Sequence, residues 1–140
     1  MTSNEDIIHV FDSEAKNLNS QIHNMRGKDV FSIADIVQIY YSLTNVDSLT
    51  KVLKDKFQEH PSISQKVQSV ETLISDFNCS THKKILEFLS NSIEEITHDL
   101  QSTNPQNKTK EEIELDAKKF SSLREIMSTK EFVQQYDRGI

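Results

Sequence analysis

Two pairs of side chains have the spacing that metal ligands use on a helix. Asp6 precedes His9 by three positions, and Glu95 precedes His98 by three positions. Helical di-iron proteins bind their metals through two inward-pointing Glu-x-x-His pairs and two further glutamates. Here one pair has Asp in place of Glu, and the apolar stripe that would face inward contains Ile8 rather than a histidine. The sequence therefore favours solvated histidines at the flanks of helices and predicts no metal site.

Cys79 is the single cysteine, and it offers little chemistry of its own. His82 follows it by three positions, but a structural zinc site needs four ligands, commonly with paired cysteines. No serine has the flanking glycines of a nucleophile elbow. A lone cysteine forms no internal disulfide and suits a reducing compartment, so we expect an intracellular protein, nuclear or cytoplasmic.

Glycine content and charge exclude further classes. Gly27 and Gly139 are the only glycines, too few for a glycine-rich phosphate loop, so no cofactor is predicted. The 16 basic and 22 acidic residues give a net charge of −6, which argues against direct binding to nucleic acid. The polar start of the chain lacks a secretory signal, and no apolar run approaches the roughly 20 residues of a membrane span. We expect no membrane insertion and no enzymatic activity.

The elements that position these residues are predicted to be helices. Turns of β-proteins depend on glycine and proline, and the 140 residues contain two of each. The predicted fold is all-α, with five to six helices carrying seven-residue apolar repeats in an elongated hairpin or bundle of coiled-coil character. The predicted organisation is a helical region over 1–101 (helices at about 5–26, 32–59, 62–78 and 81–101), a linker over 102–109, and over 110–140 a C-terminal helix plus a short terminal helix.

Four residues mark the predicted ends of helices. Gly27 is a natural C-cap after the first helix. Ser32 and Thr109 are predicted N-caps, because an acidic residue follows each of them by three positions. Pro61 fits the first turn of a helix, where its missing N–H costs little.

Two further joints are predicted inside helical patterns. The apolar repeat slips after Leu43, where the next apolar position follows after three residues again. Either the helix overwinds locally or it breaks near Asn45, and Asn45 favours the break. Ser128, with Glu131 three positions later, resembles another N-cap, and we expect it to begin the short terminal helix.

The first helix has the most regular apolar stripe, with steps of 3, 4, 3, 4 and 3 residues. A stripe this narrow on an otherwise polar helix is typical of pairing with another helix. We expect it to bind a partner protein; the alternative is a self-sufficient bundle in which the stripe is covered by the chain itself. The predicted partner-binding residues are Ile8, Phe11, Leu18, Ile22 and Met25.

Later segments repeat the pattern. The apolar residues of 63–77 and 86–100 are predicted to form a supporting hairpin. Near the C-terminus, Phe132 and Tyr136 lie close to one face of a short segment that either folds back on the bundle or docks on a partner. The predicted C-terminal helix, which precedes this short segment, has an apolar stripe of its own. That stripe consists of Ile113, Ala117, Phe120, Leu123 and Met127.

These patterns predict contact rather than catalysis. No family motif is present, and the sequence is typical of a small helical subunit of a eukaryotic multiprotein assembly. We expect a non-enzymatic structural or scaffolding subunit that joins other protein subunits by helix–helix packing in a hetero-oligomer. The alternative is a self-contained helical bundle that binds a peptide or a folded partner in a groove.

Overall fold

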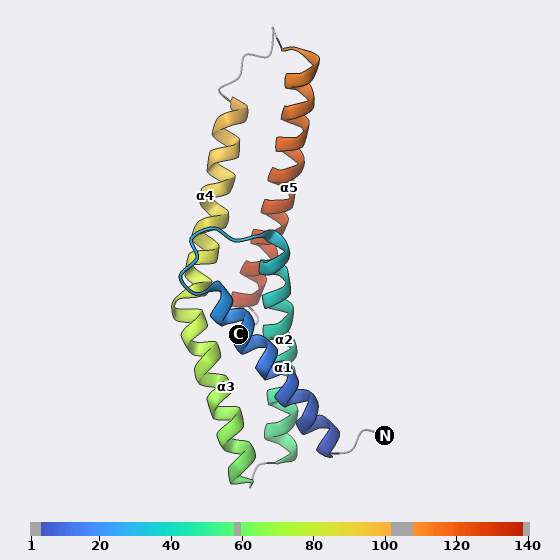
Figure 1. The fold of residues 1–140 in the computed structure, drawn as a ribbon, viewed down its shortest axis with the longest axis vertical. Helices are drawn as coiled ribbons and strands as arrows, with labels where there is room; N and C mark the ends of the chain where they lie inside the picture. Colours follow the sequence, from blue (N-terminus) through green and yellow to red (C-terminus); the bar gives the residue numbers. More distant parts are fainter. Residues whose placement is uncertain (1–3, 58–59, 102–107, 139–140) are drawn as a thin grey trace. The chain divides into compact units, whose positions relative to one another are not determined.

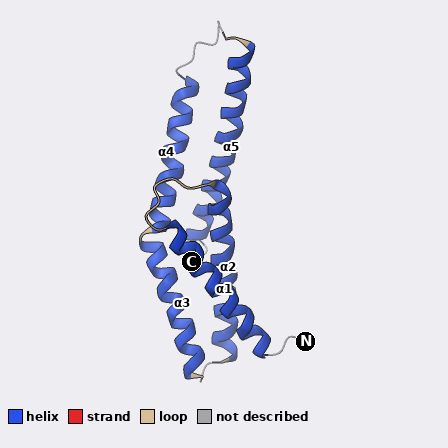
Figure 2. Cartoon of the chain, in the orientation of Figure 1, coloured by secondary structure: helices blue, strands red, loops and turns tan. Residues whose placement is uncertain are grey.

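The computed structural model describes residues 4–57, 60–101 and 108–138, and the regular structure of these residues is entirely helical (Figure 2). This confirms the all-α prediction. The chain divides into two units, Met1–Lys83 and Lys84–Ile140. The helices are α1 (Asn4–Met25), α2 (Ile33–Lys56), α3 (Pro61–Cys79), α4 (Thr81–Gln101) and α5 (Lys110–Arg138).

The first unit is a bundle of α1, α2 and α3. The helices α2 and α3 run in opposite directions, and α1 contacts both of them (Figure 1). An ion pair of 2.8 Å between Lys66 Nζ and Asp12 Oδ2 joins α3 to α1 at the surface. The interior is apolar, and its most deeply buried side chains are Phe11, Leu18, Ile22, Ile36, Ile39, Tyr40, Leu43, Val46, Leu53 and Phe77.

The predicted ends of helices are confirmed by the backbone. Gly27 follows α1 with a φ of 78°, the left-handed conformation that glycine adopts without strain. Ser32 Oγ accepts a hydrogen bond of 3.1 Å from the N–H of Asp35, and Thr109 Oγ1 accepts one of 3.2 Å from the N–H of Glu112. Pro61 is the first residue of α3. Each cap satisfies backbone groups that a helix end would otherwise leave unpaired.

Of the two alternatives at the slip after Leu43, the break near Asn45 is wrong, because α2 is continuous from Ile33 to Lys56. Leu43 and Val46 are both fully buried, so the step of three residues does not end the buried face. The helix tolerates this step because α1 and α3 both pack against α2, and a helix with two neighbours buries a wider face than a narrow stripe. Thr44 Oγ1 also donates a hydrogen bond of 2.9 Å to the carbonyl oxygen of Tyr40 inside this stretch.

The second unit contains most of α4 and all of α5, which run alongside each other (Figure 1). The structure has one helix where the sequence predicts a separate short helix from Ser128. Thr129 and Val133 are both buried, and residues four apart stay on one face only if the helix continues. Thr129 Oγ1 donates to the carbonyl oxygen of Glu125 at 2.8 Å within the same turn.

The boundary between the units lies at Lys83–Lys84, close to the start of α4. The sequence predicts a boundary in the polar segment 102–109 instead. Residues 102–107 of that segment lie outside the described residues, and Thr109 caps α5. The polar segment therefore corresponds to the connection between α4 and α5. The boundary between the units lies at Lys83–Lys84, where no glycine or proline in the sequence signals it.

Candidate interaction surface

The side chains with metal-ligand spacing lie at the surface of the structure. His9, Cys79 and His98 are exposed, as are Asp6 and Glu95. Within residues 4–57, 60–101 and 108–138, no group of three or more His, Cys, Asp or Glu side chains has a geometry that could hold a metal ion. These described residues supply no candidate metal centre.

His82 differs from the other histidines because it is 4% exposed. Its Nδ1 lies 2.5 Å from the Tyr40 hydroxyl, and the two rings meet edge to face with centroids 5.7 Å apart. The ring of Phe77 contacts Tyr40 in the same manner, at 5.8 Å. This cluster joins the first turn of α4 to α2 and α3. In the sequence, His82 stands out only because it follows Cys79 by three positions. Its contact with Tyr40 joins residues 42 positions apart, so no local sequence pattern reveals it.

The stripe of α1 lies in the interior of the first unit. Phe11, Leu18, Ile22 and Met25 are each at most 4% exposed, and Ile8 is half-buried. The structure therefore covers four of the five predicted partner-binding residues with side chains of the same chain. Their binding to a partner stays a prediction, and in this conformation α1 uses its stripe to build the bundle.

The stripe of α5 has the opposite environment. Ile113 is 57% exposed, Phe120 is 59% exposed and Met127 is 53% exposed. These three side chains are seven residues apart, so they lie nearly in line along one face of the helix. Ala117 is exposed on the same face, between the first two. We call Ile113, Ala117, Phe120 and Met127 the α5 stripe.

The other members of the predicted C-terminal pattern lie elsewhere on α5. Leu123 is half-buried, which separates it from the four exposed members of its predicted stripe. The predicted docking residues, Phe132 and Tyr136, are half-buried. Val133, which lies between them in the sequence, is fully buried. Leu115 is 53% exposed, but it lies roughly 140° around the helix from Phe120, at about 100° per residue. Leu115 is therefore an exposed apolar residue outside the α5 stripe.

A hollow of about 420 Å³ adjoins the α5 stripe inside the second unit. Met127 lines it together with Ile93 of α4. Lys130, Glu131, Gln134 and Gln135 complete its wall. The C-terminal end of the α5 stripe thus continues into a concave surface that can accept a side chain of another molecule.

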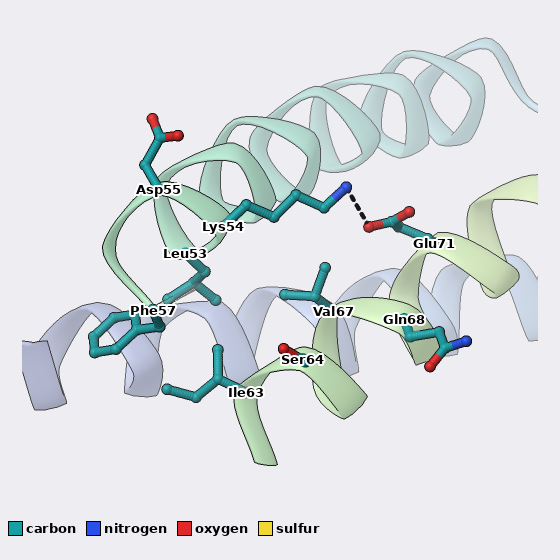
Figure 3. Close-up of a pocket in the computed structure, with 9 residues that line it drawn as sticks. All are labelled: Leu53, Lys54, Asp55, Phe57, Ile63, Ser64, Val67, Gln68 and Glu71. Atoms are coloured by element: carbon teal, nitrogen blue, oxygen red, sulfur yellow. Dashed lines mark ion pairs between the residues drawn. The ribbon is translucent and has the colours of Figure 1, made fainter. Parts of the chain in front are cut away.

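A second hollow, of about 500 Å³, lies in the first unit where α2 ends and α3 begins (Figure 3). Leu53, Phe57 and Val67 form part of its apolar floor. The ion pair between Lys54 Nζ and Glu71 Oε1, 2.6 Å long, spans its rim. Its remaining lining residues are Asp55, Ile63, Ser64 and Gln68.

Comparisons with known proteins do not assign a function to these surfaces. No protein-family model, no curated protein and no solved structure matches the chain. Across the described residues, none of the helices combines the length and the apolar character needed to cross a membrane.

Proposed function

We propose that this protein is a non-enzymatic structural subunit of a multiprotein complex, and that it contacts partner proteins through the α5 stripe. One observation carries the proposal: Ile113, Phe120 and Met127 lie on a single helix face and are each more than half exposed. Single exposed apolar residues are normal on a protein surface, but a continuous line of them marks an interaction site.

The energetic argument is the hydrophobic effect. Burial of apolar surface contributes about 25 cal/mol per Å², so covering three large side chains provides a substantial driving force for association. The seven-residue repeat of the α5 stripe is the pattern by which one helix packs along another, which supports a coiled-coil-like contact. Arg124, exposed on the same face, gives the contact a charge that selects among partners.

The difference in burial between α1 and α5 also supports this proposal. The buried stripe of α1 holds the first unit together, which leaves the α5 stripe as the surface offered to other proteins. The single cysteine agrees with a place in a reducing, intracellular compartment.

The test compares two variants of α5 with matched chemistry. Phe120→Asp places a charge on the α5 stripe, and Leu115→Asp places the same charge on an equally apolar, exposed position outside it. We expect protein partners captured by the tagged wild-type chain to be lost with Phe120→Asp and retained with Leu115→Asp. Equal capture by both variants, with far-UV circular dichroism unchanged, would contradict the proposal.

The hollow of the first unit supports a second candidate function, a bundle that binds a short apolar peptide between α2 and α3. Ser64→Trp would fill this hollow from its rim, and Ser62→Trp adds the same ring at an exposed position of α3 that does not line it. Peptides selected for binding to the wild-type chain should lose affinity for the first variant only. Equal affinity for both variants would exclude the hollow as their site.

A further inference from the structure

Burial changes abruptly along both helices of the second unit. In α4, Leu89 is 0% exposed, and among residues 90–101 no side chain is buried. In α5 the order is reversed. Among residues 110–128 no side chain is buried, whereas Thr129 is 5% exposed and Val133 is 0% exposed. We call residues 90–101 and 110–128 the exposed segments.

Apolar side chains are present in the exposed segments, but the chain covers them only in part. Ile93 and Ile96 of α4 and Leu123 of α5 are half-buried. Ile113 is 57% exposed and Phe120 is 59% exposed. In the first unit, by contrast, side chains of the same kinds are fully buried among three helices. Burial of apolar surface is the main favourable contribution to folding, so the exposed segments lack most of the driving force that stabilises the first unit.

A helix without tertiary packing is only marginally stable in water. Its first turn fixes several backbone torsions for one hydrogen bond, and isolated helices shorter than about 12–15 residues are marginal. Residues 90–101 have this length, and in the longer stretch 110–128 helix propensity alone is again a weak source of stability. Each exposed segment continues at one end into a buried part of its helix, at Leu89 in α4 and at Thr129 in α5. It can therefore open without unfolding that buried part.

From this distribution of burial we infer that the exposed segments open locally in the free chain while the first unit stays folded, and that a partner bound to the α5 stripe orders them. The ordering by a partner rests on the proposed function and adds the way in which that contact is regulated. A segment that folds on binding loses conformational entropy at that step. The apparent affinity is then reduced in proportion to the fraction of free chains in which the segment is helical. Any change that favours the helix raises the affinity without altering the contact surface.

The first experiment measures amide hydrogen exchange in the free full chain. The amides of both exposed segments should exchange at least about tenfold faster than those of α2. Protection should rise within single helices, before Leu89 in α4 and after Thr129 in α5, which gives each exposed segment a control in its own helix. Protection that is the same on both sides of these two positions would overturn the local opening.

The second experiment changes helix propensity at a position that does not touch the α5 stripe. Ser122 is exposed and lies roughly 160° around α5 from Phe120, at about 100° per residue. Alanine and glycine differ about fivefold in the helix–coil equilibrium. Ser122→Gly should therefore exchange faster than Ser122→Ala in residues 110–128 and bind a captured protein partner up to about fivefold more weakly.

The matched control for Ser122 is Ser69, which is exposed on α3 of the first unit. Ser69→Ala and Ser69→Gly should leave the exchange of the exposed segments and the partner affinity unchanged. Equal partner affinities for Ser122→Ala and Ser122→Gly would overturn the ordering on binding, because a segment that is already helical before binding gains nothing from a higher helix propensity.

Hydrogen exchange of the captured complex separates failure of this inference from failure of the proposed function. In the complex, residues 110–128 should become protected. Capture that is lost with Phe120→Asp, together with exchange that does not change on binding, would overturn the ordering and leave the proposed function standing. Equal capture by wild type and Phe120→Asp would overturn the proposed function and the ordering together. The local opening is decided by the exchange of the free chain alone.

Discussion

The stripes of α1 and α5 share a helical repeat and have opposite environments. In α1, Leu18 and Ile22 are at most 1% exposed, whereas in α5 Phe120 is 59% exposed. In both helices the apolar residues follow one another at steps of three or four positions. A periodic apolar stripe therefore indicates that a helix face is suited to packing against another helix. It does not indicate whether that helix belongs to the same chain.

The number of neighbouring helices explains the difference. The α1 helix contacts both α2 and α3, whose own apolar faces meet its stripe. Within the second unit, α5 runs alongside α4 (Figure 1), and Leu123 is half-buried whereas Phe120 is exposed. One neighbour covers one side of a helix, which agrees with the exposure of the α5 stripe, and we propose that a partner protein covers that stripe.

The largest expected effect is at Leu18. Leu18→Ala removes a fully buried side chain and leaves a cavity, which should lower the free energy of unfolding of the first unit by about 2–5 kcal/mol. Phe120→Ala, at an exposed position, should change the free energy of unfolding by no more than about 0.5 kcal/mol at concentrations where the chain is monomeric. Urea denaturation followed by far-UV circular dichroism measures the free energy of unfolding of both variants. Similar losses of this free energy for Leu18→Ala and Phe120→Ala would contradict the difference in burial between the two stripes.

A smaller loss is expected at the buried cluster of the first unit. Tyr40→Phe removes the hydroxyl 2.5 Å from His82 Nδ1 and keeps the ring contact with Phe77. Leaving a buried polar group without this partner should cost about 1–3 kcal/mol. The exposed Tyr41→Phe is the matched control, and we expect it to have little effect. Equal melting temperatures for Tyr40→Phe and Tyr41→Phe would show that the hydrogen bond contributes nothing to stability.

The N-caps should have a smaller effect still. Ser32→Ala and Thr109→Ala each remove a side chain that accepts a backbone N–H, which costs about 1 kcal/mol. Hydrogen exchange should locate each loss in the first turn of α2 or of α5. Increased exchange across both units after either single substitution would contradict their description as separate units.

The smallest effect is expected at the rim of the first-unit hollow. Lys54→Met breaks the ion pair with Glu71, whose side chains are 55% and 48% exposed. Exposed ion pairs contribute at most about 1 kcal/mol, and salt weakens them. The difference in melting temperature between wild type and Lys54→Met should shrink as NaCl is added. A difference that is unchanged at high salt would point to packing of the lysine stem instead.

Local signals in the sequence predicted most of the helices and their ends. Gly27, Ser32, Pro61 and Thr109 act through backbone conformation and neighbouring N–H groups, so their roles can be recognised without knowledge of the fold. The signal at Ser128 failed because burial of Thr129 and Val133 outweighs the preference of a serine for a cap.

The candidate surface was harder to predict than the fold. The regular spacing of the α1 stripe predicts a partner-binding role for α1, but regular spacing does not measure exposure. The contact between Tyr40 and His82 depends on residues 42 positions apart. Such contacts follow from packing between helices, which a single sequence does not display.

The most direct test of the central claim is the capture of protein partners by the tagged full chain, compared between wild type, Phe120→Asp and Leu115→Asp. The account predicts that Phe120→Asp abolishes capture while Leu115→Asp preserves it, with the same thermal unfolding for all three. Capture that is equally strong with wild type and with Phe120→Asp would contradict the assignment of the α5 stripe as the contact surface.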